Sequence, residues 1–316
     1  EWLKRFPEYA DNDLYYTSES YGGHYMPTLA KEIVDQNAAG VNPKINYKGF
    51  AVGNPATTFE STTPAMLEMY WGHQVVAKPT WDNYQSNCIK TLIPNVTKCE
   101  ALFMDMYVQI GGLNPYAIDY PVCTEDTPRK YGRSQRHWLM NHLFGDKMSS
   151  PEFKKAIGLE PVEGYEPCEE DYMTEWVNLP AVREALHVQS DIEWASCSRS
   201  IHYKQSDGHN DMTPYYNYLI DGDFGLNILV YSGDDDSVCA TVGTQGWIWD
   251  LGYEVAGRMW QTYEFNGQTA GYFTQWKDTK LGFLTVHGAG HEVPTYKPEV
   301  ALDLFTKYLN GEWTSA

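Results

Sequence analysis

Residues 13–37 read DLYYTSESYGGHYMPTLAKEIVDQN. The segment DLYYT at 13–17 predicts a short buried strand, and SESYGG at 18–23 predicts a tight turn. A helical pattern follows over about 25–37, with Pro27 near its start, where a missing N–H group does no harm. The stretch therefore predicts a strand, a sharp turn and a helix in direct succession.

The strand pattern returns three times further along the chain. The segment INYKGFAV at 45–52 predicts the next strand, which a Gly-Asn-Pro turn ends, so that a βαβ unit and a parallel sheet are expected. Apolar runs at 226–232 and 281–286 predict two more strands, and the spacing over 298–309 predicts a helix. The fold class is therefore α/β.

A long insertion separates the two parts of this sheet. Between about residues 57 and 215 the sequence has helical stretches and much Trp and Tyr, but no strand rhythm. We therefore expect residues 1–58 and 215–316 to form the core, with residues 59–214 as an inserted, mainly helical cap segment that returns to the core.

Composition excludes several classes of function. Hydrophobic residues make up 42% of the 316 residues and charged residues 21%, which is typical of a globular protein. The net charge of −19 argues against nucleic acid and anionic membrane as partners, because both require a basic face. Such acidity suits an acidic compartment, or simply keeps a secreted protein soluble.

The cysteines indicate disulfides rather than a metal site. Six cysteines occur without a CxxC pair or zinc-site spacing, so no metal is expected. Cys88 and Cys99 bracket a short loop and should pair, and Cys123 and Cys168 should form a second bridge within the insertion. Asn95 opens an N-V-T glycosylation sequon inside the short loop, which indicates the secretory pathway.

Three polar clusters follow three of the predicted strands, where open α/β sheets place their active sites. They supply Ser20, Asp236 and His291, in the chain order of nucleophile, acid and base of the α/β-hydrolase fold. An elbow would raise Ser20 above the sheet, His291 would take its proton, and Asp236 would orient the imidazole. Taken singly, they would be a turn serine, a solvated acid and a structural histidine.

Several motifs resemble those of the serine carboxypeptidase family. TSESYGGHYMPTLA at 17–30, YSGDDDSVC at 231–239 and VHGAGHEVP at 286–294 are similar to its nucleophile, aspartate and histidine motifs. Further similar stretches are KGFAVGNPATT at 48–58 and WVNLPAVREALHV at 176–188. The resemblance spans nearly the whole chain. It implies an α/β-hydrolase fold, no cofactor, and release of C-terminal residues from peptides at acid pH.

The resemblance also implies roles for residues around the three clusters. Glu19 would bind the terminal carboxylate of the substrate through a shared proton, since two ionised carboxylates in contact repel each other. The backbone N–H of Tyr21 would contribute to the oxyanion hole. Val238 and Cys239 would line the pocket for the residue before the scissile bond, and Glu292 would touch the leaving residue.

The sequence departs from the family pattern in two places. Ser18 stands where the family has a glycine of the elbow. The family's N-terminal section, with the first strands of the sheet and a Gly-rich NGGPGCSS segment, is not in the sequence, so we expect a fold without its N-terminal strands and that segment of the precursor as a partner. Cys239 follows a buried strand within the aspartate motif and should stay a free thiol. Cys197 stands where the family has the partner of a cysteine in the missing segment, so Cys197 should be unpaired as well.

Other outcomes of the same chemistry stay open at this point. The acyl-enzyme would be shared with acyltransferases and lyases on this scaffold, and a homologue without activity would serve as a binding or protective partner. Otherwise the expected partners are peptides with a free C-terminal carboxylate. The expected location is the secretory pathway, ending in a vacuole or lysosome or outside the cell. The oligomeric state stays open, a homodimer included.

Overall fold

The structure is a computed structural model that divides into two compact units, Glu1–Gly72 with His209–Ala316, and His73–Gly208. The predicted domain boundaries, after residues 58 and 214, stay a prediction. The residues that the structure describes are 1–59, 61–91, 95–123, 167–188, 192–197 and 210–314.

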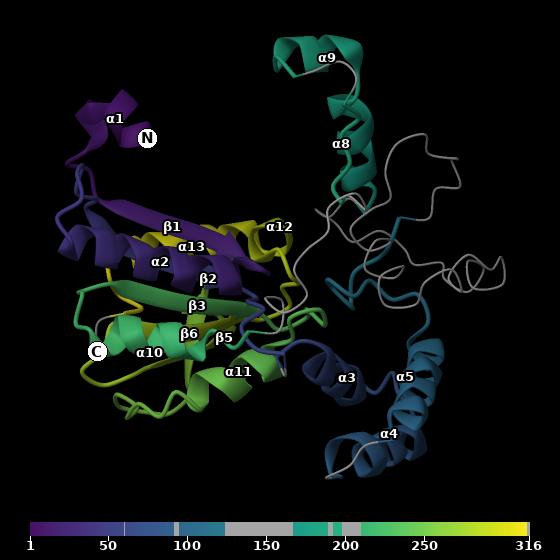
Figure 1. The fold of residues 1–316 in the computed structure, drawn as a ribbon. Coiled ribbons are helices and arrows are strands. Elements are labelled where there is room, and N and C mark those ends of the chain that lie inside the picture. Colours follow the sequence, from purple (N-terminus) through teal and green to yellow (C-terminus); the bar gives the residue numbers. More distant parts are fainter. Residues whose placement is uncertain (60, 92–94, 124–166, 189–191, 198–209, 315–316) are drawn as a thin grey trace. The chain divides into compact units, whose positions relative to one another are not determined.

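The first unit contains the sheet (Figure 1). Its elements are, in chain order, α1 (Trp2–Arg5), η1 (Pro7–Tyr9), β1 (Leu14–Glu19), α2 (Gly22–Ala38), β2 (Tyr47–Gly53), α3 (Thr63–Gly72), α10 (Thr213–Asp221), β3 (Asn227–Gly233), α11 (Thr241–Trp249), β4 (Gln261–Phe265), β5 (Gln268–Gln275), β6 (Leu281–Val286), α12 (Val293–Tyr296) and α13 (Pro298–Leu309).

The second unit is helical in its described residues. Its elements are α4 (Lys78–Tyr84), η2 (Gln85–Ile89), α5 (Val96–Ile110), α8 (Glu169–Val177) and α9 (Pro180–Ala185). Of the predicted insertion, residues 124–166 and most of 189–209 lie outside the described part of the chain.

The sheet has six strands in the order β1-β2-β3-β6-β5-β4. The first four pair in parallel, as the sequence predicts, while β5 pairs antiparallel with both β6 and β4. Because parallel strands end at the same edge, the residues that follow β1, β2, β3 and β6 are brought together there.

Alternate residues of the strands build a hydrophobic core on each face of the sheet, which is the period expected of strands covered on both sides. On one face, Phe50 and Ile228 pack with residues of α2, α10 and α11. On the other face, Ala51 and Leu229 pack with residues of α13. Helices therefore cover both faces, in three layers.

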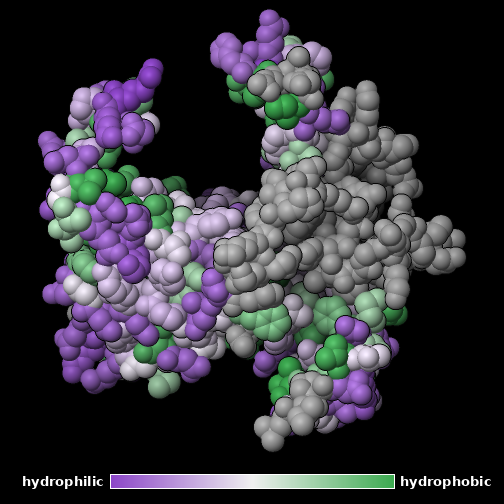
Figure 2. All heavy atoms as spheres, viewed as in Figure 1, coloured by the Kyte–Doolittle hydropathy of each residue, from purple (hydrophilic) through white to green (hydrophobic). Residues whose placement is uncertain are grey.

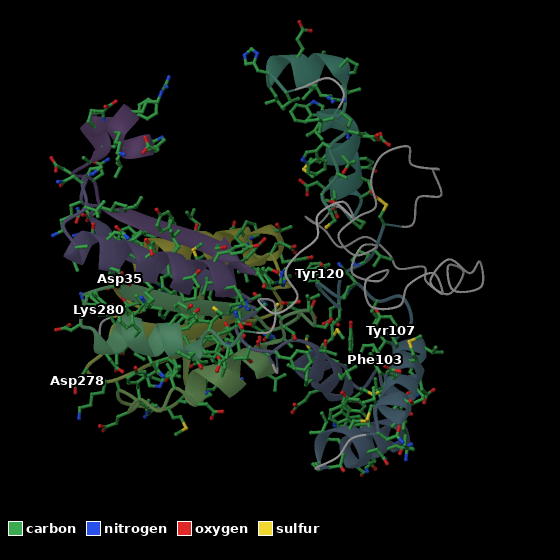
Figure 3. The ribbon with its side chains drawn as sticks, in the orientation of Figure 1. Asp35, Phe103, Tyr107, Tyr120, Asp278 and Lys280 are labelled. Atoms are coloured by element: carbon green, nitrogen blue, oxygen red, sulfur yellow. A yellow bond between two sulfur atoms is a disulfide. The ribbon has the colours of Figure 1, made fainter. Side chains whose placement is uncertain are left out.

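A polar contact joins α2 and α10, which cover the same face of the sheet. Tyr218 on α10 donates a hydrogen bond of 2.6 Å to Asp35 on α2, which Figure 3 labels. Hydrophilic side chains cover much of this face of the unit (Figure 2). Among the described helices, none combines the length and the apolar character needed to cross a bilayer.

Candidate active site

Ser20 sits at the turn between β1 and α2 with a φ of 60°, a left-handed conformation that non-glycine residues rarely adopt. Its N–H donates to the carbonyl of Gly53 at 2.9 Å, and its own carbonyl accepts from the N–H of Ala56 at 2.9 Å. These bonds fix the turn to the loop after β2. A strained serine held in this way is typical of a nucleophile elbow.

Two glycines allow α2 to start so close to the sheet. A Cβ on Gly22 would overlap the side chain of Ser18, and a Cβ on Gly23 would overlap the carbonyl of Ala56. The strand continues through Glu19, so the turn begins two residues later than the sequence predicts. Ser18 is accommodated at the family's glycine position because residue 22 has no side chain.

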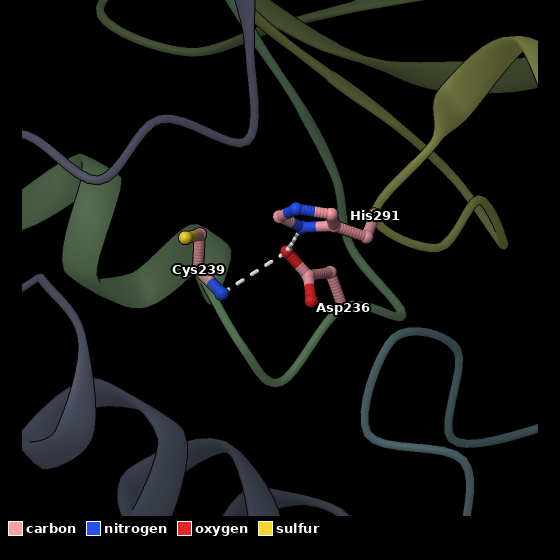
Figure 4. Close-up of side chains that lie close together, drawn as sticks. All are labelled: Asp236, Cys239 and His291. Carbon is pink, nitrogen blue, oxygen red and sulfur yellow. Dashed lines mark hydrogen bonds and ion pairs between the residues drawn. The ribbon is translucent and has the colours of Figure 1, made fainter. Parts of the chain in front are cut away.

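Asp236 lies in the loop after β3, with a fully buried side chain. Its Oδ1 accepts from the N–H of Val238 at 2.8 Å, and its Oδ2 accepts from the N–H of Cys239 at 3.1 Å. Oδ2 also lies 2.7 Å from Nδ1 of His291 (Figure 4). The loop therefore surrounds the carboxylate with donors, as a buried charge requires.

His291 follows β6 and is only 2% exposed. Burial alone would lower the pKa of its imidazole, but the adjacent Asp236, and then Glu292 and Glu19, raise it above its usual value. The bond from Nδ1 to Asp236 fixes the ring so that Nε2 is the nitrogen left to act as a base.

A second His–Asp pair joins the same two loops. Nδ1 of His287 lies 2.8 Å from Oδ2 of Asp234, but the side chain of His287 is 70% exposed. The two pairs differ in solvent exposure, because only the His291–Asp236 pair is buried away from water. The catalytic roles of Asp236 and His291 stay a prediction.

Two carboxyls lie within electrostatic reach of this pair. Glu19 is exposed to solvent, but partial loss of water around its carboxyl raises its pKa, with a smaller contribution from Asp236 and an opposing one from His291. Burial, aided by the charges of Glu19 and Asp236, raises the pKa of Glu292 to about 7. The backbone of Ser20 is bonded to Gly53 and Ala56, on either side of Asn54, and Nδ2 of Asn54 donates to Oδ2 of Asp236. Direct contact between Ser20 and His291 stays a prediction.

The ligand atoms of Asp236, Cys239 and His291 all lie within 4.8 Å of one another, which raises the question of a metal site. Burial raises the pKa of the Cys239 thiol well above its usual value as long as no metal is bound. Both carboxylate oxygens and Nδ1 already take part in hydrogen bonds. We therefore interpret the cluster as a hydrogen-bonded His–Asp pair beside a thiol.

The predicted substrate-binding residues Val238 and Cys239 lie in the loop that holds Asp236. Cys239 is 3% exposed and Val238 is half-buried. A cavity of about 490 Å³ lies elsewhere in this unit, between α3, α10 and α11, and is lined by Glu68, Asp211 and Trp247, among others. None of the predicted site residues lines this cavity, so the cavity is not part of the predicted site.

Both predicted disulfides are present, Cys88–Cys99 and Cys123–Cys168. Cys197 and Cys239 are free thiols, also as predicted. Asn95 is exposed at the start of α5, where its Oδ1 caps the helix by accepting from the N–H of Lys98 at 3.0 Å. A glycan would attach to the other side-chain atom, Nδ2, so the cap and the predicted glycosylation are compatible.

Asn54 is a site residue that the sequence did not single out. It follows β2, is fully buried, and its Nδ2 donates to Oδ2 of Asp236 at 2.9 Å. The signal in the sequence was a Gly-Asn-Pro turn at the end of a predicted strand, which by itself indicates only a turn.

Known solved structures share this fold. The chain superposes on the crystal structure of Kex1Δp, described as a prohormone-processing carboxypeptidase from Saccharomyces cerevisiae, with a TM-score of 0.68 and 18% sequence identity. The match covers 98% of this chain and 64% of that one. The likeness shows that the fold is the α/β-hydrolase fold.

The sequence comparisons agree with this fold. The chain is 32% identical to serine carboxypeptidase-like 25 and 35% identical to serine carboxypeptidase-like 33, both from Arabidopsis thaliana, over 99% and 98% of its length. It spans 64% and 63% of the length of these relatives. The family described as serine carboxypeptidase matches residues 1–311. The chain therefore belongs to the serine carboxypeptidase family.

Proposed function

We propose that the complete protein is a serine-type carboxypeptidase that releases C-terminal residues from peptides at acid pH through an acyl-enzyme on Ser20. One observation carries the proposal: the buried His291–Asp236 pair lies at the sheet edge where the strained elbow of Ser20 emerges. Family membership supports this reaction class.

In the proposed reaction, Oγ of Ser20 bonds to the carbonyl carbon of the last peptide bond while its proton passes to Nε2 of His291. The protonated imidazole then gives this proton to the leaving amine as the C–N bond breaks. A water molecule releases the acyl group from Ser20 by the same two proton transfers. Asp236 remains ionised and stabilises the imidazolium in each step.

The negative charge that develops on the carbonyl oxygen would lie at the N-terminus of α2. This helix has 17 residues, and its first residues after Ser20 supply the partial positive charge of the helix end. We assign the N–H of Tyr21 to the oxyanion hole, because the residue after the nucleophile has this role in the fold.

The requirement for a free C-terminus would come from Glu19. A carboxyl binds the substrate's carboxylate only while a proton is shared between them. The raised pKa of Glu19 keeps this proton available above the usual range of a glutamate, and it is lost as the pH rises further. Activity on free C-termini should therefore fall toward alkaline pH.

An opposing effect limits activity at low pH, because His291 acts as a base only when neutral. The negative charges of Glu292 and Glu19 are among the causes that raise its pKa. When these carboxyls take up protons in acid, that part of the effect disappears and the pKa of His291 falls. Asp236 is the larger cause of the raised pKa and still acts in acid, so the fall is partial, and the rate should decline at both ends of the pH range.

The remaining assignments follow from the same proposal. Val238 and Cys239 would face the residue before the scissile bond, and Glu292 would touch the leaving residue. Residues 59–214 would form the cap over a core of residues 1–58 and 215–316. The two disulfides support a location in the secretory pathway, since disulfides persist in oxidising compartments.

Two measurements on the complete protein test the proposal. A fluorophosphonate should label Ser20, and labelling should disappear in Ser20→Ala. Blocked dipeptides should release free amino acids at acid pH. An acyltransferase would be labelled but would pass the acyl group to an added alcohol, without release in water. Absence of labelling would point to the inactive homologue and end the proposal.

A further inference from the structure

Asn54 stands where β2 leaves the sheet, with a φ of 39°. Asparagine tolerates this left-handed conformation better than most residues. Its N–H donates to the carbonyl of Tyr231 on β3 at 2.8 Å, so the backbone is still paired with the neighbouring strand. The side chain continues beyond that point toward the loop that follows β3.

The amide of Asn54 bridges the end of β3 and the aspartate loop. Its Oδ1 accepts from the N–H of Gly233 at 2.9 Å, and its Nδ2 donates to the carbonyl of Gly233 at 3.1 Å. The second Nδ2–H points to Oδ2 of Asp236 at 2.9 Å, with Oγ of Ser232 more distant at 3.4 Å.

The orientation of this amide follows from its partners. In the flipped orientation, Oδ1 would face both the Gly233 carbonyl and the Asp236 carboxylate, and Nδ2 would face the Gly233 N–H group. All three contacts would be repulsive in a fully buried site. Only the orientation that donates to Asp236 satisfies every group.

The same carboxylate oxygen, Oδ2 of Asp236, accepts from Asn54, from the N–H of Cys239 and from Nδ1 of His291. We propose that Asn54 is a positioning residue of the catalytic pair, whose uncharged donor holds Oδ2 in line with His291. This inference rests on the proposed function, in which His291 is the base.

A consequence follows for the titration of His291. The N–H dipole of Asn54 places partial positive charge beside the imidazole and competes with it for Oδ2. Removing that dipole should strengthen the attraction of Asp236 for the imidazolium and raise the pKa of His291. The other groups that face His291 are Glu19, Glu292 and the thiol of Cys239, and they stay unchanged.

Two variants separate this role from a structural one. Asn54→Asp has the same shape and still accepts from Gly233, but places a second carboxyl against Asp236. Asn54→Gly removes the side chain and adopts a positive φ without strain. The matched control is Thr241→Val, because Oγ1 of Thr241 donates to the same Gly233 carbonyl at 3.2 Å but makes no hydrogen bond to Asp236.

The titration of His291 is measured by NMR on the complete protein with 15N-labelled histidine. We expect the midpoint to rise by about one pH unit in Asn54→Gly, because this shift corresponds to part of the free energy of a hydrogen bond to a charged group. In Asn54→Asp the midpoint should rise by more. Thr241→Val should keep the wild-type midpoint. A midpoint in both Asn54 variants equal to that of the control overturns the proposal.

Labelling of Ser20 by a fluorophosphonate gives a second readout, since this probe has no carboxylate for Glu19 to bind. The labelling rate should be proportional to the fraction of His291 that is neutral. The pH at which this rate is half-maximal should therefore rise with the NMR midpoint in both Asn54 variants. A wild-type protein that is not labelled would contradict the proposed function, while the NMR titration would still decide the role of Asn54.

Discussion

Ser18 and Gly22 lie against each other across the elbow, and the side chain of Ser18 fits only because residue 22 has none. A Cβ on Gly22 would stand 2.7 Å from Cβ of Ser18 and closer still to its hydroxyl, so rotating the hydroxyl would not relieve the overlap. The next neighbour, Cγ2 of Val52, would lie at an ordinary 3.6 Å. Ser18 is therefore the whole obstacle to a side chain at residue 22.

A double-mutant cycle tests this relationship. Gly22→Ala should lower the free energy of unfolding by about 1–3 kcal/mol through overpacking. The same change in a Ser18→Gly background should cost little, because the obstructing atoms are gone. Denaturant unfolding measures both steps. Gly246→Ala is the control, since a Cβ there meets nothing within 4 Å. Equal costs of Gly22→Ala in both backgrounds would contradict the prediction.

The alkaline limb of activity should depend on Glu19. In the complete protein, Glu19→Gln should flatten the fall of kcat/KM with rising pH for blocked dipeptides, because an amide donates a hydrogen bond to the carboxylate without titrating. The raised pKa of Glu19 places this loss above the usual range of a glutamate. Peptide amides, which lack the carboxylate, are the control substrates. An unchanged alkaline limb in the variant would remove Glu19 from this role.

The core strands could be predicted because buried parallel strands are short apolar runs that end in turn residues. The strand over 281–286 and the helix over 298–309 have the predicted bounds. The hairpin of β4 and β5 was missed because its sequence, with Gln, Thr and Glu on the exposed side, lacks such a run. The elbow was placed two residues early because Ser18 and Glu19 are polar strand residues.

The site was predictable where local motifs carry it and not where distant segments meet. Asp236 and His291 each stand in a motif that follows a strand, so their pairing could be expected. Asn54 and Asp236 are 182 positions apart in the sequence, and no local pattern around either residue predicts their contact. The family resemblance supplied the choice among neighbouring acids and histidines, which spacing alone would have left open.

The pH dependence of stability should include a contribution from Glu292. Its pKa rises from 4.5 to about 7 on folding, so the folded state holds its proton where the unfolded chain has lost it. This contribution to stability is full below pH 4.5 and is lost as the pH rises through 7. Between pH 4.5 and 8, the Tm of Glu292→Gln should therefore fall by less than the Tm of the wild type, as measured by thermal unfolding.

The control for this measurement is Glu264→Gln, which changes an exposed glutamate of β4. It should show the same change of Tm between the two pH values as the wild type. If Glu292→Gln behaves like this control, the carboxyl of Glu292 is not held in its protonated form by the fold.

Selectivity for the leaving residue should change with pH because Glu292 must be ionised to attract a cation. With a pKa of about 7, the carboxyl is mostly neutral at pH 5 and increasingly charged toward pH 7. In the complete protein, the ratio of kcat/KM for blocked dipeptides ending in Lys to those ending in norleucine should therefore rise over this range. The expected rise is about five-fold, or about 1 kcal/mol, for a pair that keeps contact with water.

Norleucine is the control side chain because it matches the lysine stem without the charge. In Glu292→Gln the ratio should stay constant. A wild-type ratio that is the same at pH 5 and pH 7 would show that Glu292 does not contact the leaving residue.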